Sequence, residues 1–209
     1  MNRSLLIQCF LIAVARRIDK MREQFNSDDR NIELCEVDLA NTNQRGIFIR
    51  DLIGRHQFIP YLINNAGIMT QGSLEELNIE DVRNAIELNA LAPWELMKSL
   101  MPIMREHNFG RIVNITSGAP LNCFAGYGAY SSSKAMLNSW TVTAAREAEK
   151  FNIKINLMSP GRWLSRSTAN RTCSSVTSVK SIPLGKYCRS SPLLFSFSPR
   201  SHGGRSSLF

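Results

Sequence analysis

Tyr61-Leu62-Ile63-Asn64-Asn65-Ala66-Gly67 is the stretch of sequence that decides the fold of this 209-residue chain. Its first three residues form a short apolar run that is typical of a strand buried on both faces of a parallel sheet. The four residues that follow are small or polar and end in glycine, so a ligand can approach the backbone there. Taken alone, those four residues also fit an ordinary turn. The stretch as a whole predicts a ligand site at the end of a buried strand.

Strand and helix patterns alternate on both sides of this stretch. Besides the strand at 61–63, we expect strands at 10–15, 32–37, 111–115 and 153–158. We expect helices at 19–25, 43–55, 79–107 and about 129–150. Such alternation predicts a parallel sheet with right-handed crossovers and helices on both faces. No internal repeat or second core is visible, so one α/β domain is expected.

The N-terminal apolar run, Leu5 to Ala15, has two interpretations. Flanked by Arg3 and by Arg16-Arg17, it resembles a short signal peptide. It is too short to span a bilayer. Residues 10–15 also fit a buried parallel strand, because such strands are apolar without interruption. The α/β pattern downstream favours the strand and a cytoplasmic protein.

Composition places the chain among globular proteins, with 44% hydrophobic and 20% charged residues. The net charge of +8 arises from residues 162–209, which hold eight of the 25 Lys and Arg and none of the 17 Asp and Glu. We therefore predict one domain over residues 1–161 and an irregular, disordered Ser/Arg-rich tail over 162–209. Without interleaved aromatic residues this tail is weak evidence for nucleic-acid or membrane binding, and neither partner is expected. The five Cys and three His show no metal-ligand spacing, so no metal site is predicted.

Tyr130 and Lys134 stand four residues apart in a predicted helix and so lie on one face, where both can meet the same ligand. A phenol is a poor acid or base near neutral pH, and an adjacent ammonium lowers its pKa by favouring the phenolate. Ser117 follows the strand predicted at 111–115, where its hydroxyl can hydrogen-bond the same ligand oxygen. The spacing alone also fits a surface tyrosine with a solvated lysine. The three residues together predict a proton-transfer site for a hydroxyl or carbonyl group.

Asn89 is a polar residue inside an apolar helical stretch, with Pro93 four positions later. This pattern indicates a locally opened helix, although a solvent-facing or capping asparagine also fits. Pro160 and Gly161 follow the last predicted strand, at the same edge as the other motifs. The motifs thus occur in a fixed order along the chain: Asn64-Asn65-Ala66-Gly67, Asn89, Ser117, Tyr130-x-x-x-Lys134 and Pro160-Gly161.

In that order and spacing, the motifs resemble the short-chain dehydrogenase/reductase family over about residues 10–161. The resemblance implies a Rossmann-like doubly wound parallel sheet and a nicotinamide cofactor that carries the hydride. It implies a catalytic tetrad in which Tyr130 is the general acid/base and Ser117 orients the substrate oxygen. Lys134 would lower the pKa of Tyr130 and hold the nicotinamide ribose, and Asn89 would fix a water that links Lys134 to solvent.

The resemblance also assigns cofactor-binding positions: Arg16, Arg17, Asp38, Leu39, Asn65, Ala66, Gly67, Tyr130, Lys134, Pro160 and Gly161. Asp38 matches an aspartate that contacts the adenine. Arg16 and Arg17 stand where the family reads the adenosine ribose, and arginine there accommodates a 2′-phosphate, whereas an acidic residue would bind the 2′-OH of NAD. Two arginines after a strand also fit solvated surface charge. NADP is therefore expected in preference to NAD.

Two departures from the family pattern bear on activity. The family's first strand and glycine-rich turn should precede Phe10, but only nine residues do and none is glycine. Because a strand and helix unit needs roughly 30 residues, we expect the sheet to lack its central strand. We also expect the backbone amides that hold the cofactor diphosphate to be absent. Beyond Ser165 the family's C-terminal elements do not appear.

Two functions from different classes follow. The first is an NADP-dependent oxidoreductase that acts on a small-molecule alcohol or carbonyl substrate. The second is a truncated, catalytically inactive relative that acts at most as a dimerisation or binding module. We expect a homo-oligomer if the chain folds, and we expect weak binding of nicotinamide cofactors because of the missing glycine turn.

Overall fold

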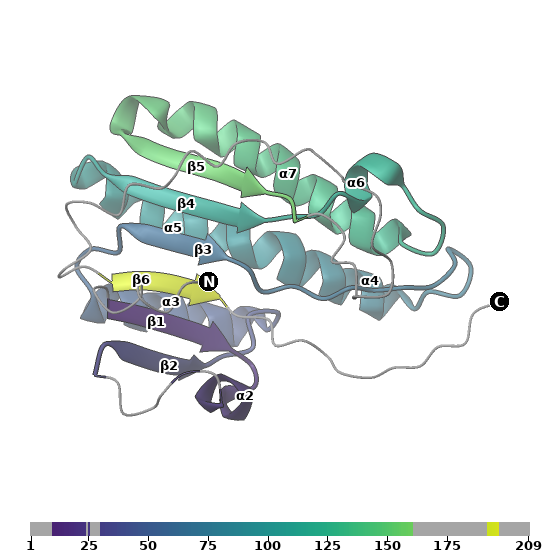
Figure 1. The fold of residues 1–209 in the computed structure, drawn as a ribbon, viewed down its shortest axis with the longest axis horizontal. Coiled ribbons are helices and arrows are strands. Elements are labelled where there is room, and N and C mark those ends of the chain that lie inside the picture. The colour runs from purple at the N-terminus through teal and green to yellow at the C-terminus, as the bar shows by residue number, and fades with distance from the viewer. Residues whose placement is uncertain (1–9, 24, 26–29, 161–191, 197–209) are drawn as a thin grey trace, which may run out of the picture.

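The computed structural model describes residues 10–23, 25, 30–160 and 192–196, and they form one sheet with its helices (Figure 1). The strands are β1 (Phe10–Ala15), β2 (Ile32–Glu36), β3 (Tyr61–Asn64), β4 (Gly110–Ile115), β5 (Ile153–Met158) and β6 (Pro192–Ser196). All neighbouring strands are parallel, in the order β2-β1-β6-β3-β4-β5. The chain therefore builds outward from the centre, through β1 and β2 on one side and through β3 to β5 on the other. Ligands of open α/β sheets bind where the strand order reverses in this way.

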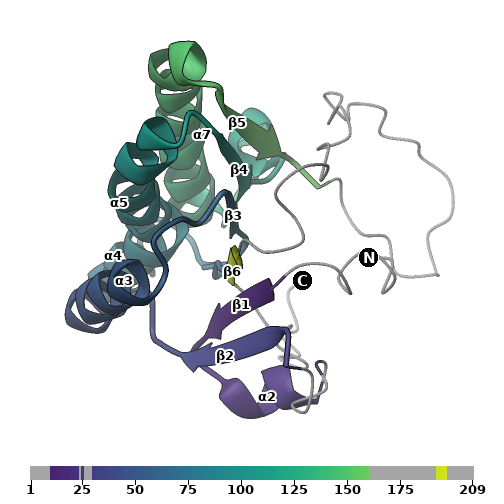
Figure 2. The ribbon, with the colours of Figure 1, turned by 90° about the vertical axis from the view of Figure 1, so that its left-hand side faces the viewer.

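The helices lie on both faces of the sheet (Figure 2). They are α2 (Ile18–Arg22), α3 (Thr42–Arg55), α4 (Ile79–Ile86), α5 (Ala92–Glu106), α6 (Ala119–Asn122) and α7 (Gly128–Ala148). The π-helical turn η1 (Glu87–Leu91) joins α4 to α5, and the 3₁₀ turn η2 (Glu149–Phe151) follows α7. Helices α3, α5 and α7 cover one face, and α2 packs on the other face at β1 and β2. The doubly wound α/β arrangement expected from the sequence is confirmed.

The side chains of β1 alternate between two apolar clusters, one on each face of the sheet. Ile12 and Val14 join the cluster beneath α3, α5 and α7, whereas Leu11 and Ala13 join the cluster beside α2. Successive residues of a strand point to opposite faces, so a strand covered on both faces must be apolar throughout. The strand interpretation of residues 10–15 is therefore confirmed.

The expectation that the sheet lacks its central strand is wrong. Residues 192–196, which belong to the predicted irregular tail, form β6 between β1 and β3. Leu194 is 1% exposed and pairs in register with Ile12 of β1 and Leu62 of β3. This apolar segment supplies backbone partners to two strands that would otherwise have unpaired edges. The remainder of the tail, with Gly161 and Ser165, lies outside the described residues.

The single helix expected over residues 79–107 is instead divided into α4, η1 and α5. Pro93 lies in the first turn of α5 and has no N–H, so the α-helical bond from residue 93 to the carbonyl of Asn89 cannot form. The locally opened helix predicted around Asn89 is confirmed. Among the described residues no helix is both long enough and apolar enough to cross a membrane.

Candidate active site

The predicted site residues follow the carboxyl ends of the strands, which meet at one edge of the sheet (Figure 1). Arg16 and Asp38 follow β1 and β2, on one side of β6. The Asn64–Gly67 turn, Ser117 and Pro160 follow β3, β4 and β5, on the other side. Tyr130 and Lys134 come from the first turns of α7, and Asn89 comes from η1. The topology thus places one group of residues on each side of β6, where the strand order reverses.

Gly67 lies directly against Asn89 and Lys134. A Cβ atom at position 67 would come within 3.0 Å of Asn89 Oδ1 and 3.3 Å of Lys134 Nζ. Contacts that short are tighter than ordinary van der Waals packing, so any larger side chain would push into both groups. The structure therefore brings together three residues that stand far apart in the sequence, and glycine is the residue that leaves room between them.

Asn89 is fully buried and holds the turn after β3 through its side chain. Its Oδ1 accepts a hydrogen bond from the backbone N–H of Ile68 at 2.9 Å, and its Nδ2 donates to the Ile68 carbonyl at 2.9 Å. Nδ2 also donates to Ser133 Oγ on α7 at 2.9 Å. One amide group therefore joins η1, the turn and α7, which excludes the solvent-facing alternative.

Lys134 is 5% exposed, and its Nζ donates to the carbonyl of Ile115 at the end of β4, at 2.9 Å. Burial lowers the pKa of Lys134 to about 8, because removing an ammonium from water disfavours its charged form. Tyr130 precedes Lys134 by one helical turn, so both side chains rise from the same face of α7. The solvated lysine of the alternative interpretation is therefore excluded.

Ser117 and Tyr130 contact the backbone. Ser117 Oγ accepts the N–H of Ala119 at 3.1 Å, at the start of α6, and the Tyr130 carbonyl accepts Ser133 Oγ–H at 2.8 Å. Among the described residues no hydrogen bond joins the Ser117 and Tyr130 hydroxyls to each other or to Lys134. The four predicted catalytic residues thus share one edge, and Asn89 and Lys134 are in direct contact with its central turn.

On the other side of β6, Arg16 Nη1 lies 3.8 Å from Asp38 Oδ2. The Arg16 side chain is 65% exposed, and the Asp38 side chain is 30% exposed. Asp38 Oδ1 accepts the N–H of Ala40 at 3.0 Å, which fixes the turn of the loop after β2. Leu39 is buried, and only its carbonyl takes part in polar contacts of this loop, with Arg45 of α3. Asp38 and Arg16 are therefore two side chains that this side offers to a ligand. Arg17, the next residue after Arg16, is half-buried.

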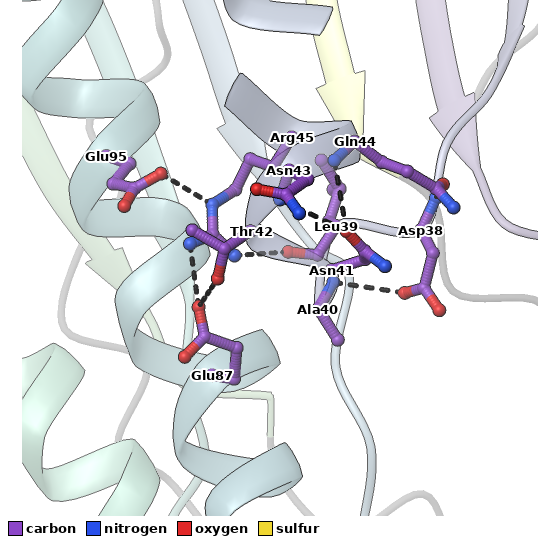
Figure 3. A network of polar contacts seen from close by, with 10 residues as sticks. All are labelled: Asp38, Leu39, Ala40, Asn41, Thr42, Asn43, Gln44, Arg45, Glu87 and Glu95. Carbon is purple, nitrogen blue, oxygen red and sulfur yellow. Dashed lines mark hydrogen bonds and ion pairs between the residues drawn. The ribbon is translucent and has the colours of Figure 1, made fainter. Parts of the chain in front are cut away.

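Three residues of the site were not predicted from the sequence. Ser133 bridges Asn89 and Tyr130, as described above. Ser196 ends β6, and its Oγ accepts the N–H groups of Asn65 and Ala66 at 2.9 and 3.1 Å. Arg45 is 1% exposed and joins the loop after β2 to η1 and α5 (Figure 3). Serines in Ser-rich stretches and an arginine on an amphipathic helix carry no signal in a sequence.

The residues present fit the two nucleoside ends of a nicotinamide dinucleotide. Gly67 lets the backbone after β3 lie close against Lys134 Nζ, and Lys134 offers donors to ribose hydroxyls. Arg16, exposed beside Asp38, offers a cation at the adenosine end. The diphosphate between these ends would lie at the carboxyl end of β6, and the residues after Ser196 lie outside the described part of the chain. Within that part no cluster of His, Cys, Asp and Glu could hold a metal ion.

Comparison with known proteins agrees with this geometry. The family model for short chain dehydrogenase matches residues 7–174. A 3-oxoacyl-[acyl-carrier-protein] reductase from Synechocystis sp. is 29% identical over 152 residues, which cover 73% of this chain and 61% of the relative. A benzil reductase from Bacillus cereus is 32% identical over 161 residues, which cover 72% of this chain and 64% of the relative. The chain thus spans less than two thirds of each of these curated relatives.

Solved structures give the same result. A short-chain dehydrogenase from Streptomyces avermitilis matches with a TM-score of 0.67 and 31% identity, over 71% of this chain and 55% of that one. A metagenomic short-chain oxidoreductase in complex with NADP matches with a TM-score of 0.66 and 28% identity, over 72% and 70% of the two chains. A 4-hydroxyisoleucine dehydrogenase complexed with NADH and succinate matches with a TM-score of 0.69 and 27% identity, over 76% and 68%. With its sheet order, its Asn89 and Lys134 contacts and a family match over most of its length, the chain belongs to the short-chain dehydrogenase/reductase family of oxidoreductases.

Proposed function

We propose that the chain is an NADP-dependent oxidoreductase that interconverts an alcohol and a carbonyl compound, with Tyr130 as the general acid/base. The observation that carries the proposal is the convergence of Gly67, Asn89 and Lys134 at the carboxyl edge of the sheet. A buried lysine one helical turn from a tyrosine is costly to maintain, and such groups concentrate at functional sites.

In this proposal each residue has a defined task. A bound nicotinamide cofactor supplies the hydride. Tyr130 donates a proton to the carbonyl oxygen in reduction and accepts it in oxidation, and Ser117 orients that oxygen. Lys134 holds the nicotinamide ribose through its ammonium group. Asn89 fixes the turn that carries Gly67, so that this turn keeps its position beside Lys134.

NADP is proposed in preference to NAD because Arg16 lies at the adenosine end with most of its side chain in water. An arginine there can pair with a 2′-phosphate, while Asp38 remains available to the adenine. Both kinds of cofactor occur among the structural relatives, with NADP in one and NADH in another. The cysteines Cys35 and Cys123 are free thiols, which supports the proposal of a reducing compartment such as the cytoplasm.

We also propose that the chain forms homo-oligomers through α5 and α7. The two helices enclose a hollow of about 380 Å³, lined in part by Trp94, Trp140 and Phe151. Trp94 is 37% exposed, although its ring is large and apolar. Aromatic residues around a hollow on a helical face are typical of protein interfaces.

The proposed activity is tested with Tyr130→Phe. We expect NADPH-dependent reduction of small ketones to fall to background, because no other acid replaces the phenol. Binding of NADPH, measured by calorimetry, should be retained in the variant. The matched control is Tyr127→Phe, three residues earlier at the start of the same helix. Turnover that survives in Tyr130→Phe would overturn the assignment, and failure of the unaltered protein to bind NADPH would favour the catalytically inactive relative.

A further inference from the structure

Arg45 is the most deeply buried charged side chain that the proposed reaction does not use. It lies on α3 and is 1% exposed. Its guanidinium makes three contacts with three different segments (Figure 3). Nε donates to Glu95 Oε2 at 2.7 Å, Nη2 donates to Glu87 Oε1 at 2.6 Å, and Nη1 donates to the Leu39 carbonyl at 2.6 Å. Burying a charge is costly unless it is paired and hydrogen-bonded, and here every part of the fork has an acceptor.

The electrostatics of this cluster favour the charged forms of Arg45 and Glu95. Burial alone would lower the pKa of Arg45, but hydrogen bonds and charges from Glu95 and Glu87 raise it above its ordinary value. The hydrogen bond from Arg45 holds the pKa of Glu95 below its ordinary value. The Glu87 and Glu95 side chains are 25% and 31% exposed, so they face both Arg45 and water. The cluster is therefore a buried guanidinium held between two partly exposed glutamates.

The two glutamates lie at the start of the π-helical turn and shortly after its end. Glu87 is the first residue of η1, and Glu95 lies in the first turn of α5. In a regular α-helix, residues eight positions apart differ by about 80° around the axis. The π-helical turn holds about one residue more than an α-helical turn. This reduces the angle around the axis between Glu87 and Glu95 to about 20°. Both carboxylates can then reach one guanidinium, as Figure 3 shows. The Arg45 contacts thus fit the π-helical form of this segment better than the α-helical form.

Glu87 and Asn89 face opposite sides of η1. Residues two apart on a helix point in roughly opposite directions. Glu87 faces α3, where Thr42 Oγ1 also donates to Glu87 Oε1 at 3.3 Å, while Asn89 faces the Ile68 backbone and Ser133. Arg45 therefore binds the side of η1 that faces α3, and Asn89 lies on the side of η1 that faces the turn after β3.

From these contacts we propose that Arg45 is a positioning residue of the active site. It holds η1 in its π-helical form through Glu87 and Glu95, and thereby presents Asn89 to the turn after β3. Through the Leu39 carbonyl it also holds the loop that carries Asp38, so that the two sides of the cofactor site form one rigid unit. The roles of Asn89 and Asp38 in this statement rest on the proposed function.

The first test measures hydrogen exchange in the Arg45→Met variant without any cofactor. The N–H of Ile68 bonds to Asn89 Oδ1, and the N–H of Ala92 bonds to Glu87 O, so these two amides report on η1. We expect both to exchange roughly tenfold faster or more, as for the loss of hydrogen bonds to charged groups. The amide of Ile112 in β4 serves as the reference for global opening. A change that is equal at all three amides, or no change at Ile68 and Ala92, would overturn the proposal.

The control is Arg55→Met on the same helix. Arg55 also contacts two carboxylates, those of Asp51 and Glu33, but its side chain is 41% exposed and neither carboxylate belongs to η1 or α5. Its removal should leave Ile68 and Ala92 exchange unchanged. A second variant replaces Arg45, Glu87 and Glu95 together by Met, because a buried ion network replaced by apolar groups can regain stability. If that variant regains stability but the Ile68 amide still exchanges fast, Arg45 positions the turn independently of its effect on stability. Slow exchange of the Ile68 amide in the stable variant would overturn the proposal.

The second test measures NADPH binding by calorimetry. Arg45→Met should weaken binding roughly tenfold, because the Asp38 loop and the Asn89 turn lose their common support, while Arg55→Met should not. Unchanged binding in Arg45→Met would overturn the coupling between the two sides. Should the unaltered protein fail to bind NADPH, the proposed function fails, and the exchange test still decides the role of Arg45.

Discussion

The ammonium group of Lys134 lies where a charge is costly, because the residue is 5% exposed and its one described partner is a neutral carbonyl. Burial lowers its pKa to about 8 from an ordinary 10.5. Below pH 8 the lysine is protonated in both the folded and the unfolded chain. The cost of burying its charge then lowers the free energy of unfolding by its full amount. Between pH 8 and 10.5 the unfolded chain binds more protons, so this contribution to the free energy of unfolding rises with pH.

We therefore predict that Lys134→Met is more stable relative to the unaltered protein below pH 8 than at pH 10.5. The shift corresponds to about 3 kcal/mol at most, and loss of the Ile115 hydrogen bond offsets part of it. Urea unfolding at several pH values measures the difference. Lys154→Met, at an exposed position of β5, should show no such pH-dependent difference. A Lys134→Met advantage that stays constant from pH 6 to 10.5 would contradict the buried charge.

Arg16 and Arg17 decide the cofactor preference in the proposed function. Replacing both by Ala should weaken NADPH binding by roughly 1.5–3 kcal/mol, the value of a charge-assisted hydrogen bond. NADH has no 2′-phosphate, so its binding should change little. Calorimetry with both cofactors measures the difference, with the exposed Arg146→Ala on α7 as the control. Equal losses for NADPH and NADH would make these arginines ordinary surface charges.

The sequence pointed to the residues proposed to be catalytic but not to the residues that hold them. Tyr130, Lys134 and Asn89 were found because each is unusual where it stands, as a spaced pair or as a polar residue in an apolar stretch. Ser133, Ser196 and Arg45 act through contacts with residues more than 40 positions away. Neither spacing nor periodicity within a short window contains such partners.

Among the elements, η1 and β6 are the ones on which the site depends. The alternation of apolar runs predicted β1 to β5 and the long helices, because those patterns repeat within each element. Strand β6 is short and lies in a Ser-rich, basic stretch. The composition of residues 162–209 as a whole therefore predicted no strand there. It forms because β1 and β3 leave a place where an apolar segment buries Leu194 and pairs its backbone on both sides.

Ser196 is the contact through which β6 supports the site. Replacing it by Ala leaves the N–H groups of Asn65 and Ala66 without their acceptor, at a cost of about 1–3 kcal/mol in the free energy of unfolding. Urea unfolding measures the loss, and hydrogen exchange should quicken at those two amides. Ser131→Ala is a matched control, because the buried Ser131 hydroxyl has no hydrogen-bond partner within the described residues. An equally large loss in Ser131→Ala would show that Ser196 acts by packing alone.

At the scale of the molecule, β6 joins two halves that the chain builds separately. Strands β1 and β2 carry the Arg16 and Asp38 side of the site, and β3 to β5 carry the Asn89 and Lys134 side. Among the strands that the structure describes, only β6 pairs with strands from both halves. The Arg45 network joins the halves again on the face covered by α3 and α5. The surface of α5 and α7 that points away from the sheet takes no part in this connection. We propose that it is available for contact between copies of the chain.

On that surface Trp94 and Trp140 lie with their ring centroids 5.9 Å apart, and Lys98 Nζ lies 5.0 Å from the Trp94 ring. A stable interface buries about 800 Å² on each partner. We predict that the unaltered protein sediments as a dimer or larger assembly and that Trp94→Glu sediments as a monomer, because a carboxylate at the centre of an apolar contact is costly to bury. Sedimentation velocity distinguishes the two. Leu121→Glu, at an 85% exposed position of α6, should leave the assembly intact. A monomer in the unaltered protein, or equal dissociation by both variants, would place any contact between copies elsewhere on the molecule.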